Sequence, residues 1–256
     1  MSSIATTVFK VIIDLLENKG RDIIKAAEKL KDGHKKDPLL DLEIDYLLSY
    51  LDRLSKEKLL ASISFFEEGI DLLYDVFNKT RSSSEHNTST TQAAKLELTY
   101  VDESATRALS NAKTRFKVAR WKAIEAFANE ALSMAIRILA MQFRVMATIL
   151  ERIDNPEDAI APCMACIADL NSMAPVKDAF KVELNKGWRS RFGKDERRKI
   201  IVEVCRTNMV VQDVFSSLGF IIKLPPILVE DKDVDPLRDE RVLEVLRKLD
   251  IEFQSE

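Results

Sequence analysis

The chain of 256 residues is long enough to bury a substantial core without disulfides or metal ions, and it fits one large domain or two small ones. Six glycines and seven prolines are few for this length, and scarce glycine argues against dinucleotide-binding and P-loop folds. With 42 acidic and 39 basic residues the net charge is −3, which is no signature of nucleic-acid binding. The composition favours helices and leaves the function open.

Residues 1–79 are predicted to form several helices that pack on the rest of a bundle. Gly20 stands where a helix would end, and Asp37-Pro38 supplies the cap residue and the first-turn proline that open another helix. Residues 80–94 are rich in serine and threonine and lack large apolar side chains. We therefore expect a flexible linker over 80–94.

The segment 95–219 is predicted to contain one long helix followed by further bundle helices. Residues 102–153 contain neither proline nor glycine, and good helix formers prevail among them. An unbroken helix of that length would rise about 78 Å, whereas a compact domain of this size has a radius of gyration of about 18 Å. We therefore expect an all-α fold, an elongated multi-helix bundle built around one long central helix at about 102–153.

Signals for the start and the end of helices are also found after the long helix. Asn155-Pro156 restarts a helix, with a cap residue and a proline at the first helical position. Pro225-Pro226 excludes helix, so a short extended segment is expected near 220–229. Residues 220–256 are predicted to combine this segment with an acidic terminal helix.

Basic and acidic residues are segregated along the chain. Residues 36–79 carry ten acids and five bases, whereas residues 107–122 carry six bases and no acid. The simplest interpretation is that such segments complement each other on facing helices of one bundle. Aromatic residues among basic ones are also typical of surfaces that bind anionic lipid or single-stranded nucleic acid. Trp121, however, shares with Ile124 and Phe127 the helical spacing of a row that faces the core. The residues expected to contact lipid or a partner are Lys113, Lys117, Arg120, Trp121, Lys122, Arg189 and Arg191.

Residues 131–150 form an apolar run that would be about 30 Å long as a helix, enough to span a bilayer. Arg137 and Arg144 interrupt the run, and each arginine costs about 2.5–3.5 kcal/mol at a bilayer centre on insertion scales. Charged residues recur at every seventh position and form one polar stripe, comprising Glu130, Arg137, Arg144 and Glu151. Such a helix is either the buried centre of a bundle, with its stripe paired to acids, or a segment that enters lipid after a rearrangement.

Motifs for catalysis or metal binding are sparse. Cys163 and Cys166 have CxxC spacing, but zinc needs two further ligands, and no second CxxC exists. On a helix the two cysteines share a face with Ile167, which is typical of a buried core. Three cysteines form no disulfide framework, and two histidines leave little for acid–base chemistry near neutral pH. We expect no catalytic residue, no metal site and no cofactor.

The sequence therefore predicts a non-enzymatic helical-bundle protein that acts in protein interaction or as a scaffold and self-associates through its long helix. The partner would be a second copy or another protein, and the net charge argues against nucleic acid. The alternative is a membrane-active effector, pore-forming or lipid-binding, that inserts residues 131–150 into an anionic membrane. The N-terminus has no basic segment ahead of an apolar run, so we expect a cytoplasmic location.

Overall fold

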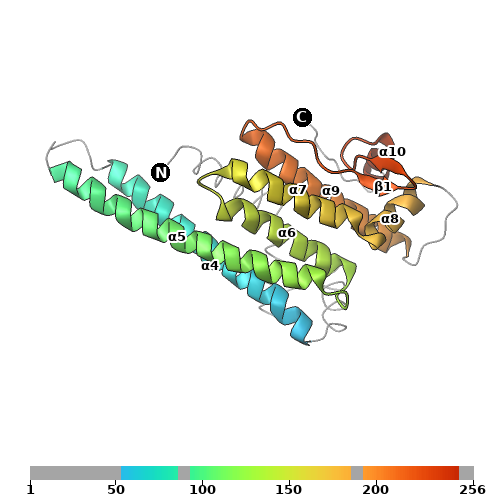
Figure 1. The fold of residues 1–256 in the computed structure, drawn as a ribbon, viewed down its shortest axis with the longest axis horizontal. Coiled ribbons are helices and arrows are strands. Elements are labelled where there is room, and N and C mark those ends of the chain that lie inside the picture. The colour runs from blue at the N-terminus through green and yellow to red at the C-terminus, as the bar shows by residue number, and fades with distance from the viewer. Residues whose placement is uncertain (1–52, 86–92, 186–192, 248–256) are drawn as a thin grey trace.

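The computed structural model describes residues 53–85, 93–185 and 193–247, so the helices predicted within residues 1–52 lie outside this part of the chain. The described elements are mostly helices, with one small two-stranded sheet, which confirms the all-α class. A long helical hairpin lies on one side of the molecule, and the helices of the C-terminal half lie on the other (Figure 1).

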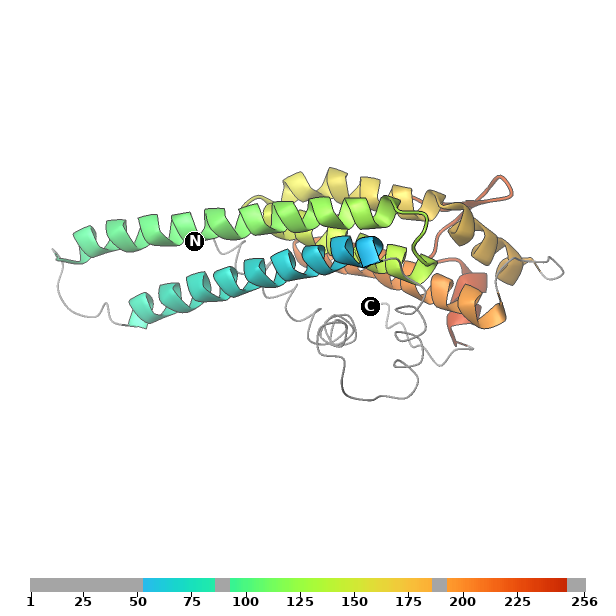
Figure 2. The ribbon, with the colours of Figure 1, turned by 90° about the horizontal axis from the view of Figure 1, so that it is seen from below.

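Helices α4 (Arg53–Glu85) and α5 (Ala93–Ala128) form an antiparallel hairpin that extends past the other helices at one end (Figure 2). Large apolar side chains of α4 pack against a row on α5 that is mostly alanine. Because alanine lets two backbones approach closely, the hydroxyl of Ser62 donates a hydrogen bond of 2.8 Å to the carbonyl of Ala119. The buried residues of this contact are Leu59, Ile63, Phe66 and Leu73 on α4, and Ala112, Phe116, Ala119, Ala123 and Ala126 on α5.

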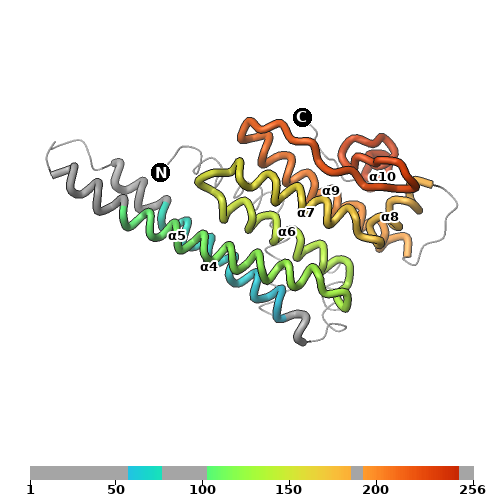
Figure 3. The backbone as a smooth tube through the Cα atoms, viewed as in Figure 1, coloured from blue at the N-terminus to red at the C-terminus, as the bar shows by residue number. Residues whose placement is uncertain are grey.

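The prediction of one continuous helix over 102–153 is wrong, because the chain turns back on itself after α5. Helix α6 (Met134–Glu151) runs back along the hairpin, as the backbone tube in Figure 3 shows. Local side-chain bonds hold the turn: Asn129 Oδ1 accepts from the amide of Ala131 at 3.0 Å, and the N-cap Ser133 accepts from the amide of Ile136 at 3.5 Å. Such bonds offer the backbone an alternative to the helix, and the apolar face of α6 is then buried against α4 and α5.

The linker predicted over 80–94 is also too long. Helix α4 continues to Glu85 and α5 begins at Ala93, so only residues 86–92 lie outside the described residues here. Extending an established helix adds one hydrogen bond for each residue that is fixed, whereas starting one is costly. Polar composition alone therefore placed the two helix ends too far apart.

The second layer begins with a short 3-10 turn (Pro156–Ala159) and contains three helices. These are α7 (Ile160–Ser172), α8 (Ala174–Leu184) and α9 (Lys194–Ser217). Helix α6 contacts the hairpin on one side and both α7 and α9 on the other, and most of its side chains are buried. Helix α6 is thus the centre of the fold, as expected for a bundle core.

Aromatic rings connect α6 to the hairpin. The ring of Phe66 makes edge contacts with Phe116 at 5.6 Å and with Phe143 at 5.4 Å between centroids, so one ring from each of α4, α5 and α6 meets in the core. Edge-to-face pairs of this kind add about 0.5–1.5 kcal/mol beyond the apolar area that they bury.

The extended segment expected near 220–229 is confirmed. After an irregular stretch over residues 220–226, β1 (Ile227–Val229) pairs antiparallel with β2 (Lys232–Val234), and Ile227 lies opposite Val234. Helix α10 (Glu240–Arg247) follows and buries Val242 and Leu246 against the second layer.

The turn between β1 and β2 has an unfavourable conformation for its residues. Glu230 (φ 48°) and Asp231 (φ 62°) are both in the left-handed region, which favours glycine. The carboxylate of Glu230 is held by Lys181 Nζ at 3.0 Å and by Asn185 Nδ2 at 2.8 Å.

Replacing Asp231 with glycine is expected to raise the free energy of unfolding by about 0.5–1 kcal/mol, because glycine adopts positive φ without a Cβ penalty. Urea denaturation would measure the change. The matched variant Glu230→Gly should show no such gain, since it also removes the bonds to Lys181 and Asn185. Equal gains at both positions would contradict this account of the turn.

Candidate interaction surface

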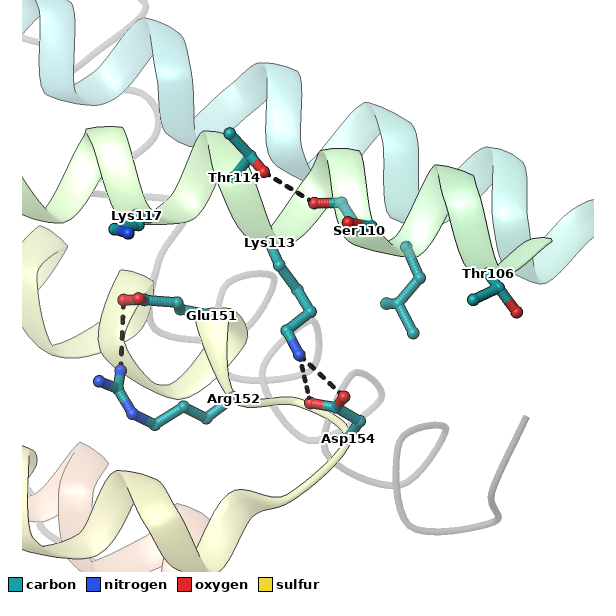
Figure 4. Close-up of a pocket in the computed structure, with 9 residues that line it drawn as sticks. Thr106, Ser110, Lys113, Thr114, Lys117, Glu151, Arg152 and Asp154 are labelled. Atoms are coloured by element: carbon teal, nitrogen blue, oxygen red, sulfur yellow. Dashed lines mark hydrogen bonds and ion pairs between the residues drawn. The ribbon is translucent and has the colours of Figure 1, made fainter. Parts of the chain in front are cut away.

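The basic segment of α5 borders a polar groove between this helix and the end of α6 (Figure 4). The groove has a volume of about 530 Å³. Hydroxyl and ammonium groups of α5 line one wall, and charged residues at and after the end of α6 line the other. The lining residues are Thr106, Leu109, Ser110, Lys113, Thr114, Lys117, Glu151, Arg152 and Asp154.

Ion pairs attach the two walls of the groove to each other. Lys113 Nζ lies 2.8 Å from both carboxylate oxygens of Asp154. Arg120 Nε donates to Glu151 at 2.6 Å, and Arg152 contacts the same carboxylate at 3.2 Å. The side chains of Arg120 and Glu151 are only 20% and 15% exposed, so salt screens this pair less than a surface pair. These contacts hold α5 against α6. Lys113 and Arg120 are therefore both paired with carboxylates of the same chain.

Trp121 lies on the outer face of α5, with 52% of its surface exposed. The ammonium group of Lys117, one turn earlier, lies 5.3 Å from the centroid of the indole ring, a cation–π distance. The expectation that Trp121 faces the core is therefore wrong. The core-facing row of α5 passes through Ala119, Ala123 and Ala126 instead. Lys117 and Trp121 together present a cationic and aromatic surface to solvent.

Lys122 does not belong to this surface. Its ammonium group contacts Glu125 at 3.2 Å, and Lys58 of α4 contacts the same carboxylate at 2.9 Å. The bond from Lys58, followed by that from Lys122, holds the pKa of Glu125 below its usual range. Lys122 therefore contributes to the contact between α4 and α5. Arg189 and Arg191 lie outside the described residues.

The four residues of the predicted polar stripe are not brought together as one site. Glu130 is exposed in the turn between α5 and α6, and Glu151 belongs to the groove. Arg144 Nη1 contacts Asp169 of α7 at 2.8 Å. This pairing is the one expected for a buried helix whose stripe meets acids on its neighbours.

Arg137 has a different environment from the other stripe residues. Its Nε donates to the carbonyl of Phe127 at 2.8 Å, and its guanidinium lies 5.5 Å from the centroid of the Phe127 ring. Burial lowers the pKa of Arg137, although a guanidinium keeps its charge near neutral pH. Arg137 of α6 thus stabilises the turn between the two helices by contacting Phe127 at the end of α5.

A buried polar cluster between α7 and α9 was not foreseen from the sequence. Asn171 and Asn208 are within 3.5 Å of each other through their amide groups, and Asn208 Nδ2 also donates to the carbonyl of Val204 at 2.8 Å. Asn171 Nδ2 donates to the carbonyl of Pro225 at 2.7 Å, which anchors the extended segment on α7. Asparagine is rarely buried unless it is hydrogen-bonded, so its presence among apolar positions was the available signal.

Gln142 forms a second polar contact, between α6 and α9. Its Nε2 donates to Glu203 at 3.1 Å and to the hydroxyl of Thr207 at 3.3 Å. Gln142 is buried among mostly apolar side chains of α6. The contact therefore fixes the position of α6 along α9, since a shift of either helix would leave a buried amide unpaired.

Cys163 and Cys166 lie in the core, as their spacing predicted. Both thiols are buried on α7 beside Ile167, and burial raises the pKa of each. A thiol held neutral in this way is a poor nucleophile and a poor metal ligand. No group of three or more histidine, cysteine, aspartate or glutamate side chains within 53–85, 93–185 and 193–247 is placed to hold a metal ion.

None of the individual helices in the described part of the chain combines the length and hydropathy needed to cross a bilayer. The bent pair formed by residues Pro156–Ser172 and Ala174–Leu184, with an angle of 63° between its parts, reaches that length and hydropathy only when taken together.

A scan against protein-family models matches no family, and searches of curated proteins and of solved structures return no significant match. The class of the protein, an all-α helical bundle, therefore rests on its own fold.

Proposed function

We propose that the protein is a non-enzymatic helical-bundle interaction protein that self-associates through the outer face of α5. The observation that supports this proposal is the exposure of Trp121 beside Lys117 on a rigid helix. Tryptophan is enriched among the residues that contribute most to binding energy, because it buries a large area with little loss of conformational entropy. An indole ring left half exposed therefore marks the centre of a binding surface.

The apolar residues 131–150, which first suggested self-association, are not the surface that we propose. Most of them are buried where α6 packs against the hairpin and the second layer. Insertion of the same residues into a bilayer would require α6 to leave both sets of neighbours. The outer face of α5, by contrast, is exposed without any rearrangement.

Sedimentation equilibrium of the full chain tests the proposal. The wild-type protein should self-associate, and Trp121→Ala should raise the dissociation constant at least about tenfold, which corresponds to about 1.4 kcal/mol. Ile221→Ala is the matched control, because Ile221 is fully exposed in the stretch that follows α9, outside the hairpin. A protein that stays monomeric at high micromolar concentration, or a Trp121→Ala variant that associates like the wild type, would overturn the proposal.

Vesicle flotation distinguishes a lipid surface from a protein partner. Flotation of the wild-type protein with anionic vesicles, lost in Trp121→Ala, would assign the same surface to a membrane and so contradict self-association as its function. We expect no flotation at physiological salt.

A further inference from the structure

We infer that the polar groove between α5 and the end of α6 binds a phosphate monoester of a hydroxylated compound. Its phosphate would lie between Lys117 and Arg152, at the end of the groove that also contains Glu151 (Figure 4). This site is separate from the self-association proposed above, and Lys117 is the only residue that the two share. The charge balance of the groove, its unused donors and its polar lining support the inference.

Basic side chains outnumber acidic ones at the groove. Four bases accompany two acids, which leaves a net charge of +2. The bases are Lys113, Lys117, Arg152 and Arg120, the last bonded to a lining carboxylate, and the acids are Glu151 and Asp154. The exposed acids nearest along the chain, Glu103, Glu157 and Asp158, do not line the groove. A phosphate monoester carries nearly two negative charges at pH 7 and would balance this excess.

Both acids of the groove already have cationic partners. Asp154 lies 2.8 Å from Lys113 Nζ, and Glu151 accepts from Arg120 Nε at 2.6 Å and from Arg152 Nη1 at 3.2 Å. An anion that enters the groove is therefore repelled little by these carboxylates, and the cations that remain can attract it.

Lys117 is one of these remaining cations. It follows Lys113 by one turn and precedes Arg120 by one turn on the same face of α5, so it lies between the two ion pairs that cross the groove. Within the described part of the chain, the ammonium group of Lys117 has no carboxylate partner.

Arg152 supplies the second set of donors. Only its Nη1 is bonded, to Glu151 and to the carbonyl of Thr148, each at 3.2 Å. Among the described residues, Nε and Nη2 of Arg152 have no hydrogen-bond partner, and neither is a buried atom. These adjacent donors match the spacing of two phosphate oxygens, which is why arginine often binds phosphate through two parallel hydrogen bonds.

The rest of the groove is suited to a polar group. Its volume of about 530 Å³ is within the usual range for small-molecule sites. Thr106, Ser110 and Thr114 contribute hydroxyl groups, and Leu109 is the one apolar side chain among the lining residues. The hydroxyl of Thr114 donates to the carbonyl of Ser110 at 2.9 Å and can still accept a hydrogen bond. The compound that carries the phosphate is therefore expected to be hydroxylated rather than apolar.

Isothermal titration calorimetry of the full chain with glycerol 3-phosphate tests the inference. At low ionic strength the dissociation constant should be about 1 mM or lower, and added salt should raise it. Glycerol without the phosphate should not bind. Absence of binding at about 10 mM glycerol 3-phosphate would overturn the inference.

Substitutions locate the phosphate within the groove. Lys117→Gln and Arg152→Gln should each raise the dissociation constant about fivefold or more. Lys117→Gln breaks no ion pair, so the test holds even if Arg152→Gln weakens the fold. Asp154→Asn should instead lower the dissociation constant, because it removes a negative charge and frees Lys113.

Arg107→Gln is the matched control, since Arg107 is an exposed base of α5 that does not line the groove. It should bind like the wild type, and a loss equal to that of Lys117→Gln would overturn the inference by showing an unspecific effect of net charge.

Vesicles that contain phosphatidic acid distinguish a lipid headgroup from a free ester. Flotation that is lost in Arg152→Gln and kept in Trp121→Ala would support the site with a lipid as the source of the phosphate. Binding of glycerol 3-phosphate without flotation, which we expect, supports a free ester.

Discussion

Replacing Ile138 with glutamate is expected to lower the free energy of unfolding by at least about 4 kcal/mol. Ile138 is 1% exposed in the second turn of α6, the helix that lies between the hairpin and the second layer. A carboxylate there would lose its hydration, and burial of this kind can raise the pKa of a glutamate by several units, each worth about 1.36 kcal/mol. Since small domains are stable by about 5–15 kcal/mol, this single change threatens the whole fold.

The loss of stability should depend on pH. The unfolded chain ionises the new carboxyl above about pH 4.3, whereas the folded protein must keep it neutral up to its raised pKa. Unfolding therefore becomes easier as the pH rises through that window, and the variant should be least impaired near pH 4. Urea denaturation at several pH values would measure this.

Ala135→Glu is the matched control for Ile138→Glu. Ala135 is exposed in the first turn of the same helix, where an acidic side chain is compatible with the helix dipole. We expect no loss of stability in this variant. If Ile138→Glu were as stable as Ala135→Glu, α6 would not be the core of the bundle, and its apolar face would be free to contact lipid.

Replacing Phe116 with alanine is expected to cost about 3–5 kcal/mol. Phe116 is fully buried and contacts Phe66, which in turn contacts Phe143. The substitution removes the apolar contacts of the ring and leaves a cavity that the three packed helices fill only in part. Thermal and urea denaturation would measure the change.

Gly69 of α4 gives this prediction a second, independent test. A Cβ at Gly69 would lie 2.6 Å from Cε1 of Phe116, closer than real contacts allow, so Gly69→Ala should destabilise the wild-type protein by about 1–3 kcal/mol. In the Phe116→Ala background the clash is absent and alanine is the better helix former, so the same change should become neutral or stabilising. Additive effects of the two changes would show that Gly69 and Phe116 do not touch.

The fold class and the C-terminal extended segment follow from local signals, whereas the main turn of the fold does not. Pro225-Pro226 excludes helix whatever surrounds it. The turn after α5 contains neither proline nor glycine, and its cap, Ser133, has no glutamate or glutamine three residues later to announce it. The chain turns at Asn129 because α6 is buried on the hairpin. That contact includes α4, which is distant in the sequence, so no local sequence pattern indicates it.

The orientation of Trp121 on α5 was predicted wrongly. The spacing of Trp121, Ile124 and Phe127 suggested a core-facing row, because large apolar residues dominate any hydrophobicity pattern. The true core row is composed largely of alanine, whose weak hydrophobicity hides its face. Because α4 packs closely on α5, small side chains occupy the contact between the two helices, and Trp121 lies on the opposite, exposed face of α5.

The ion pairs that stabilise the groove could not be predicted either. Lys113 and Asp154 lie far apart in the chain, and their contact depends on the return of α6 along α5. Because the turn between α5 and α6 was not predicted, no ion pair between these two helices could be predicted either. Residue type alone indicated which side chains carry charge, and only the fold decides which of them remain unpaired.

The hydrogen bond from Asn171 to the carbonyl of Pro225 has a consequence for the order of folding during synthesis. The contacts of the hairpin with α6 join neighbouring elements, so they can form while the ribosome is still translating the later part of the chain. The amide of Asn171 must wait until Pro225 has left the exit tunnel. The hairpin can therefore pack on α6 in the nascent chain before the extended segment docks on α7.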